Sequence, residues 1–115
     1  KEIKILLENK TMKEITVSEL KKLKADNADF QLIDVREEHE LEICQIGGLH
    51  IPMGDVMDNL DKIARDKQVI VHCRSGARSG AICQALESQG YTNVYNLKGG
   101  IIAWANEIDK SLPKY

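Results

Sequence analysis

The chain has 115 residues, a length typical of one domain that buries its own core. Its composition, 43% hydrophobic and 30% charged residues, is that of a folded globular protein. The net charge of −2 argues against a general surface for polyanions, so nucleic acid is not an expected partner. No apolar run has the length of a membrane span and no signal-peptide pattern occurs, so we expect a cytoplasmic protein without a membrane partner.

Cysteine usage and the start of the chain give two further expectations. The three cysteines, Cys44, Cys73 and Cys83, are not spaced as metal-ligand pairs, which favours free thiols in a reducing compartment over disulfides or a zinc site. We therefore expect neither a metal nor a cofactor. Residues 1–13 mix apolar and polar positions like the tail of a preceding element and a linker, and we expect a single domain over residues 14–115.

Short apolar runs alternate with helical patterns along the rest of the chain. Strands are predicted over residues 14–17, 30–35, 49–52, 69–71 and 91–97, and helices over residues 17–25, 37–42, 55–64, 79–89 and 101–108. The acids of residues 37–42 are interpreted as first-turn charges that complement a helix dipole, and residues 111–115 as a plain tail. The alternation predicts an α/β fold with about five strands in a mainly parallel sheet and helices on both faces.

The stretch over residues 68–86 contains a strand, a loop and a helix. Val69–Val71 is β-branched, as in a buried strand, and the loop from Cys73 to Arg78 follows it. Ser79 is predicted to be the N-cap of the next helix. This order places Cys73 at the carboxyl end of a strand and before a helix N-terminus, where loop amides and the helix dipole stabilise an anion.

A thiol in that position, close in sequence to Arg74 and Arg78, is shifted toward the thiolate. Cys73 is therefore a candidate nucleophile. The alternative, a small buried residue at the end of a strand, fits poorly with so polar a loop. Cys44 is interpreted as a buried hydrophobic residue, with a role as a second redox thiol or sulfur relay left open, and Cys83 is expected on the packed side of its helix.

Several residues outside the loop are candidates for supporting it. Asp34 and Arg36 project to the same side of an extended chain, and we favour a polar clamp that satisfies backbone groups over a catalytic acid or an anion-binding arginine. His50 is interpreted as a hydrogen-bonded structural residue. Gly99 and Gly100 are interpreted as a turn that lets the chain pass close to the active loop, although such a turn can also cradle a phosphate.

Four segments, in order and at ordinary intervals, carry the most specific signal. They are Leu32–Glu37, Gly48–Pro52, Val71–Ser79 and Asn96–Gly100, the last followed by Trp104. Together they resemble the single-domain rhodaneses, a family of sulfurtransferases. The resemblance implies a rhodanese-like fold and a persulfide on Cys73 that carries sulfur from a donor such as thiosulfate to a thiophilic acceptor. It also implies that the substrate-binding loop consists of Arg74, Ser75, Gly76, Ala77, Arg78 and Ser79, with Arg74 or Arg78 attracting an anionic donor.

Cysteine phosphatases resemble the same stretch, including the His72–Cys73 pair and an arginine before a serine. They need that arginine six positions after the cysteine. Here the sixth position is Ser79, and Arg78 comes one residue early. The loop is thus too short for a tetrahedral phosphate, which favours sulfur transfer.

Two readings within the rhodanese resemblance also differ in function. One is a low-activity or regulatory binding module, which is disfavoured because such modules usually lack the cysteine. The other is the carboxyl-terminal rhodanese domain of the molybdopterin- and thiamine-synthesis adenylyltransferases, which residues 42–48 and 112–115 resemble. It implies that sulfur from a small-molecule or protein persulfide donor passes to a ubiquitin-like sulfur carrier protein.

Overall fold

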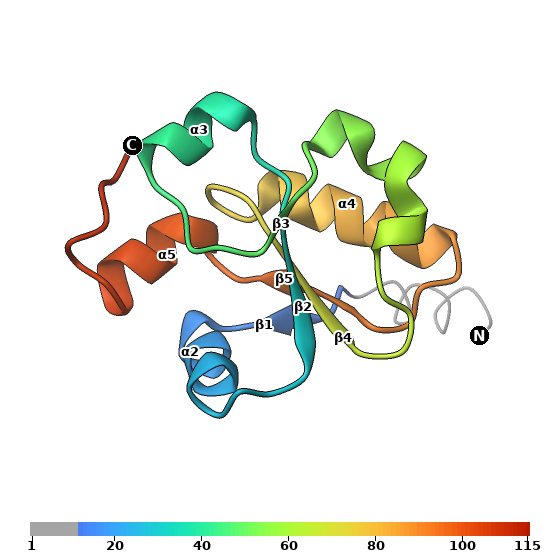
Figure 1. Cartoon of the computed structure of the whole chain (residues 1–115), viewed down its shortest axis with the longest axis horizontal. Coiled ribbons are helices and arrows are strands. Elements are labelled where there is room, and N and C mark those ends of the chain that lie inside the picture. Colours follow the sequence, from blue (N-terminus) through green and yellow to red (C-terminus); the bar gives the residue numbers. More distant parts are fainter. Residues whose placement is uncertain (1–11) are drawn as a thin grey trace, which may run out of the picture.

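The computed structural model describes residues 12–115, and a five-stranded sheet forms its centre (Figure 1). The strands are β1 (Glu14–Ile15), β2 (Phe30–Asp34), β3 (Leu49–His50), β4 (Gln68–His72) and β5 (Val94–Leu97), in the spatial order β1-β5-β4-β2-β3. Each neighbouring pair is parallel. The prediction of an α/β fold with a parallel sheet is confirmed, whereas the predicted linker lies almost wholly outside the described residues.

Helical segments connect the strands and cover both faces of the sheet. They are α2 (Val17–Ala25), α3 (Glu38–Ile43), the 3₁₀ segment η1 (Met53–Lys62), α4 (Ala77–Ser88) and α5 (Gly100–Glu107). In Figure 1, α4 and η1 lie on one side of the sheet and α2 and α5 on the other. Within residues 12–115, no helix combines the length and the apolarity needed to span a bilayer.

The central strands β2 and β4 divide their side chains between two cores. Ile33, Val69 and Val71 pack in the core beneath α4 and η1, whereas Leu32 and Ile70 pack in the core with α2 and α5. Successive residues of a strand point to opposite faces, so a strand covered on both faces is apolar throughout. This is why both strands were recognisable from the sequence.

The start of α4 differs from the prediction. The helix begins at Ala77, so the prediction of Ser79 as its N-cap is wrong, and Gly76 occupies the N-cap position with φ +108°. Glycine adopts this left-handed conformation at little cost because it has no Cβ. The turn therefore enters the helix early and places Ser79 inside the first turn, where it is fully buried.

Two other elements also differ in detail. The first strand ends at Ile15 because the Thr16 side chain accepts a hydrogen bond from the Glu19 N–H and caps α2. The helix predicted over residues 55–64 is the 3₁₀ segment η1, which is interrupted by non-helical backbone at Asn59.

Candidate active site

Cys73 is the first residue after β4 and lies immediately before the turn into α4. It is 1% exposed. Because β4 lies between β2 and β5, the carboxyl ends of neighbouring strands meet around this position. In open parallel sheets this is the edge at which ligands bind.

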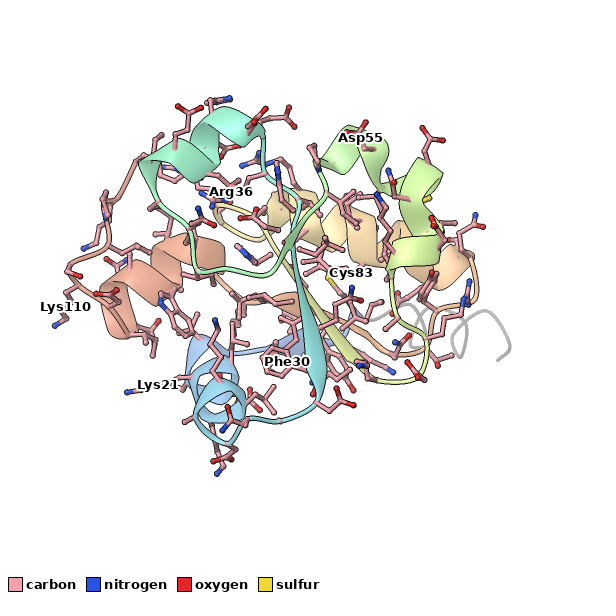
Figure 2. All side chains as sticks on the ribbon, in the orientation of Figure 1. Lys21, Phe30, Arg36, Asp55, Cys83 and Lys110 are labelled. Carbon is pink, nitrogen blue, oxygen red and sulfur yellow. The ribbon has the colours of Figure 1, made fainter. Side chains whose placement is uncertain are left out.

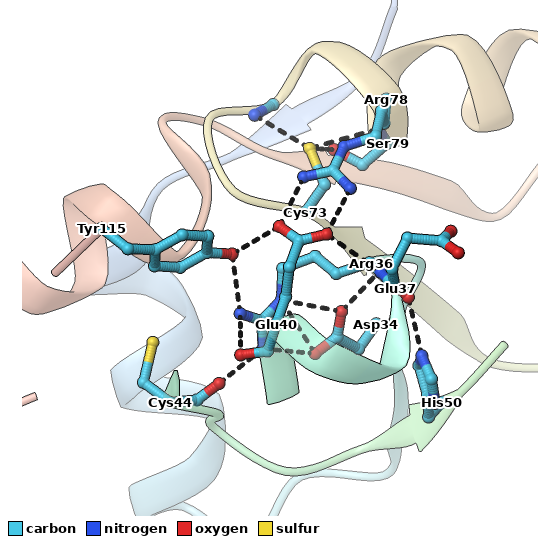
Figure 3. A network of polar contacts seen from close by, with 11 residues as sticks. Asp34, Arg36, Glu37, Glu40, Cys44, His50, Cys73, Arg78, Ser79 and Tyr115 are labelled. Atoms are coloured by element: carbon cyan, nitrogen blue, oxygen red, sulfur yellow. Dashed lines mark hydrogen bonds and ion pairs between the residues drawn. The ribbon is translucent and has the colours of Figure 1, made fainter. Parts of the chain in front are cut away.

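Three hydrogen-bond donors point at the Cys73 sulfur. Its Sγ accepts from the Gly76 N–H at 3.1 Å, from the Ser79 N–H at 3.4 Å and from the Ser79 hydroxyl at 3.3 Å (Figure 3). The two backbone donors are held by the turn and by the first turn of α4, so they need no rearrangement to meet a charge. The arrangement can stabilise an anionic sulfur at this position.

The pKa of the Cys73 thiol is lowered from its ordinary value. Burial has the largest single influence and acts to raise this pKa, because it disfavours the charged thiolate. Hydrogen bonds from the Ser79 hydroxyl and from the main chain of Ser79, Gly76 and Ser75 act in the opposite direction and together prevail. The donors therefore favour the thiolate in a buried position.

Arg78 faces the loop from α4, but its guanidinium is already paired. Its Nη1 and Nη2 donate to the two carboxylate oxygens of Glu40 at 2.6 and 2.9 Å. This contact lowers the pKa of Glu40, which is only 5% exposed, and raises that of Arg78. Arg74, Ser75 and Ala77 are exposed, so Arg74 is the more accessible arginine of the loop.

Tyr115 brings the end of the chain into the same network. Its hydroxyl donates to Glu40 Oε2 at 2.7 Å and accepts from Arg36 Nη1 at 2.9 Å. Its ring centre lies 5.0 Å from the Arg74 guanidinium, which also donates to the Tyr115 main-chain oxygen. Figure 3 shows Tyr115, Glu40 and Arg78 side by side next to Cys73.

Arg36 is completely buried, and all five of its side-chain N–H groups have acceptors. Nε and Nη2 donate to the Asp34 carboxylate at 2.9 to 3.2 Å. The remaining donors reach the carbonyl oxygens of Cys44 at 2.8 Å and Glu40 at 3.3 Å, and the Tyr115 hydroxyl. Burial acts to raise the pKa of Asp34, but the contacts with Arg36 prevail and lower it. The geometry supports a polar clamp, since Arg36 has no free donor for an anionic substrate.

Two histidines lie near this clamp. His50 Nε2 is 2.7 Å from the Arg36 carbonyl oxygen, as in a structural hydrogen bond. His72 is completely buried, its Nε2 lies 3.7 Å from Asp34 Oδ2, and neither ring nitrogen has a hydrogen-bond partner among the described residues. Burial lowers the pKa of His72 to about 4, although the Asp34 charge acts to raise it. His72 is therefore neutral at pH 7.

The Gly99–Gly100 turn passes directly against the Cys73 loop. A Cβ on Gly100 would lie 2.4 Å from the Arg74 carbonyl oxygen and 2.7 Å from that of Cys73. The N–H groups of Ile101 and Ile102, at the start of α5, donate to those two carbonyls, to Cys73 at 3.0 Å and to Arg74 at 3.1 Å. These contacts favour the interpretation of Gly99–Gly100 as a turn that passes close to the loop, rather than as a phosphate cradle. The N–H groups at the start of α5 already donate to carbonyl oxygens of the loop.

The other two thiols lie apart from these donors. Cys83, labelled in Figure 2, lies on α4 and is completely buried. Burial, with smaller effects of Glu87 and Cys73, raises its pKa to about 12. Cys44 is 7% exposed, and both are free thiols. In the part of the chain that the structure describes, no group of three His, Cys, Asp or Glu side chains is arranged to hold a metal ion.

Sequence reasoning missed three residues of this site: Glu40, Asn96 and Tyr115. Glu40 was interpreted with its neighbours as a first-turn charge that complements the helix dipole, and in the structure it also forms a capping box with Glu37. That pairing constrains the orientation of the helix and is the one signal that could have distinguished Glu40. Asn96 and Tyr115 lie within stretches that carry the family resemblance, but the sequence does not show their roles, because their partners Ser79 and Glu40 are distant in the sequence.

Comparison with known proteins agrees with this geometry. The model of the rhodanese-like domain family matches residues 16–107. A sulfurtransferase of Allochromatium vinosum is 42% identical over 93 residues, which cover 80% of this chain and 87% of that protein. The adenylyltransferase and sulfurtransferase UBA4 of Meyerozyma guilliermondii is 33% identical over 98 residues, which cover 77% of this chain but 23% of that protein. A solved rhodanese-like domain protein from Staphylococcus aureus has a TM-score of 0.77 at 33% identity and covers 84% of this chain and 95% of its own. The chain therefore belongs to the rhodanese-like domain family.

Proposed function

We propose that the protein is a sulfurtransferase that carries a sulfane sulfur as a persulfide on Cys73. The observation that carries this proposal is the convergence of the Gly76 N–H, the Ser79 N–H and the Ser79 hydroxyl on one buried sulfur atom. Such a ring favours a thiolate at Cys73 Sγ, the atom that attacks the donor. The sulfurtransferase relative from Allochromatium vinosum supports the same activity.

The reaction has two steps and needs no external oxidant. The Cys73 thiolate attacks the outer sulfur of a donor such as thiosulfate, the sulfur–sulfur bond of the donor breaks, and sulfite leaves with the electron pair. A thiolate or cyanide then attacks the outer sulfur of the persulfide and releases the Cys73 thiolate. This is double-displacement chemistry through a covalent intermediate. No separate base is needed when Cys73 is already ionised.

The pairing of Arg78 with Glu40 affects which donor the site favours. With Arg78 bound to a carboxylate, Arg74 is the residue that we assign to attracting an anionic donor such as thiosulfate. A protein or small-molecule persulfide places less negative charge at the site and depends less on these arginines. We expect the protein to act in the reducing cytoplasm, because its three cysteines are free.

A ubiquitin-like sulfur carrier is the protein acceptor that we propose. The similarity to UBA4, which is named as both adenylyltransferase and sulfurtransferase, supports this acceptor. The resemblance of residues 42–48 and 112–115 to the rhodanese domain of the molybdopterin- and thiamine-synthesis adenylyltransferases supports it as well. Incubation of the persulfidated protein with a carrier whose carboxyl-terminal glycine has been adenylylated tests this acceptor. The outer sulfur of the persulfide attacks the acyl carbon and AMP leaves; an added thiol then attacks the Cys73 sulfur of the acyl disulfide, which releases the carrier thiocarboxylate and leaves Cys73 in a mixed disulfide. A persulfide that reacts with cyanide but never with the adenylylated carrier contradicts this acceptor.

Mass spectrometry after incubation with thiosulfate tests the main proposal. We expect one added sulfur atom on the Cys73 peptide, none on the Cys44 or Cys83 peptides, and removal of that sulfur by cyanide. The Cys73→Ser variant is the control, and we expect no added sulfur atom on its peptides. If the unaltered protein turns over a phosphate ester without accepting sulfur, the site is that of a phosphatase. If it does neither with any sulfane-sulfur donor, the chain is a binding module.

A further inference from the structure

The buried amide of Asn96 lies beside the Cys73 loop. Asn96 is on β5, pairs with Val71 of β4, and is 3% exposed. Its Nδ2 donates to the Gly76 carbonyl oxygen at 3.0 Å. Because a carbonyl only accepts, this contact fixes the orientation of the amide and turns Oδ1 toward the Ser79 hydroxyl.

The Ser79 hydroxyl lies between two acceptors but carries one proton. Its oxygen is 3.3 Å from Cys73 Sγ and 2.5 Å from Asn96 Oδ1. An amide oxygen only accepts, and so does a thiolate. The hydroxyl can therefore donate to one of them at a time, whereas the N–H groups of Gly76 and Ser79 remain directed at the sulfur in either case.

The protonation state of Cys73 decides which acceptor is left without the hydroxyl. When Cys73 is a thiol, its S–H can donate to the Ser79 oxygen while Ser79 donates to Asn96, so every group is paired. When Cys73 is a thiolate, the hydroxyl is needed at the sulfur, and Asn96 Oδ1 loses its donor. Ionisation of Cys73 therefore requires a hydrogen bond to be taken from Asn96.

We propose that Asn96 is a positioning residue that competes with the Cys73 thiolate for the Ser79 proton, so that this hydroxyl turns toward the sulfur only while that atom is anionic. The competition sets how readily Cys73 ionises. One consequence rests on the proposed function: in the persulfide the charge lies on the outer sulfur, so Cys73 Sγ no longer needs the hydroxyl. Ser79 then returns to Asn96.

The other groups around the Cys73 sulfur show which charges could also change the pKa of this thiol. The charged and titratable groups that act on it are Arg78 and Cys83, both on α4, and Arg78 is paired with Glu40 of α3. The segments that pack on the loop from β5 and α5 present the neutral Asn96 and the Gly99–Gly100 turn. Asn96 thus acts through Ser79 rather than through charge.

The pH dependence of alkylation tests this competition in four proteins: the unaltered chain, Ser79→Ala, Asn96→Ala and the double variant. The rate of Cys73 modification by iodoacetamide, followed on its peptide, gives the pKa of the thiol. We expect Ser79→Ala to raise that pKa by about half a unit to one unit, because the thiolate loses a donor. Asn96→Ala should shift it downward by about half a unit more with Ser79 present than in the Ser79→Ala background.

Equal shifts in the two backgrounds would overturn the proposal and leave Asn96 as a structural anchor of Gly76. Asn96→Leu, which fills more of the space, replaces Asn96→Ala if the latter does not fold; the Gly76 carbonyl then keeps the Gly80 N–H at 3.0 Å. Ser88→Ala is the matched control, since this exposed hydroxyl of the same helix donates to Gln84 and should cause no shift. No sulfur donor is used, so the outcome is independent of the proposed sulfur transfer.

Discussion

Cys73 and Cys83 lie in the same core, but the pKa values of their thiols are shifted in opposite directions. They are 1% and 0% exposed, respectively. The pKa of Cys73 is lowered by hydrogen bonds that prevail over burial, whereas burial raises the pKa of Cys83 to about 12. Exposure therefore does not distinguish the two thiols. The cysteine that we propose as the nucleophile is the one at which the turn directs the Gly76 N–H.

His72 extends the comparison to the residue next to Cys73. The two side chains follow each other at the end of β4, so they point to opposite faces. His72 has no hydrogen-bond partner for its ring among the described residues, and burial keeps it neutral. Burial thus favours the neutral form of both His72 and Cys83, whereas at Cys73 the hydrogen-bond donors outweigh burial and favour the thiolate.

The largest expected effect separates the two thiols directly. Cys73→Ser should reduce sulfur transfer from thiosulfate to cyanide by at least about a thousandfold, because the attacking atom is lost. Cys83→Ser should leave the rate within about twofold, since Cys83 does not contact the loop donors. Steady-state rates measure both, with circular dichroism to check folding. A large loss in a folded Cys83→Ser protein would instead indicate a two-thiol mechanism.

A substitution in the Gly99–Gly100 turn, which packs against the Cys73 loop, should have the next largest effect. Gly100→Ala places a Cβ against the carbonyls of Arg74 and Cys73, at a residue with φ +59°. We expect the unfolding free energy to fall by about 3–4 kcal/mol, because the loop that carries Cys73 must move. Gly54→Ala is the matched control, with nothing within 4 Å of its Cβ. Similar denaturation midpoints for the two variants would contradict the close-passage interpretation.

The lowered pKa of His72 predicts how the free energy of unfolding depends on pH. Its pKa is about 4 in the folded protein against about 6.5 in an unfolded chain, so the unfolded state binds the proton first as pH falls. Stability should therefore decrease between about pH 6.5 and pH 4, by on the order of 3 kcal/mol from this residue. Urea denaturation across that range measures it. His72→Phe should flatten the profile, whereas substitution of the exposed His39 by glutamine should not; an unchanged profile in His72→Phe would assign the effect to the carboxylates.

The smallest expected effect concerns the charge of Arg78. Glu40→Gln removes its partner, and we expect unfolding free energy to fall by about 1–2 kcal/mol because the pair is partly solvated. The released guanidinium should lower the KM for thiosulfate by about threefold and leave that for a neutral persulfide donor unchanged. The exposed Glu38 of the same helix provides the control variant Glu38→Gln. A KM that rises would mean that Glu40 positions Arg78 productively.

The features of the fold and the site that could be predicted from the sequence are those that depend on local patterns. The apolar strands β2 and β4, the glycine turn before α4 and the position of Cys73 between strand and helix each depend on neighbouring residues, so the sequence shows them. The Ser79 prediction was wrong because the left-handed Gly76 starts α4 earlier, and a cap inferred from residue type cannot register that shift. The same shift brings the Ser79 hydroxyl to the sulfur.

The sequence by itself determined the α/β architecture, the family and the identity of the candidate nucleophile, because periodicity and short motifs are local properties of the chain. Only the tertiary structure decided that Glu40 pairs with Arg78, that Tyr115 joins them, and that the Ser79 hydroxyl lies within hydrogen-bonding distance of Asn96. Those pairings join residues far apart in the sequence. They arise because parallel strands bring their carboxyl ends, and the loops that follow them, to one edge of the sheet.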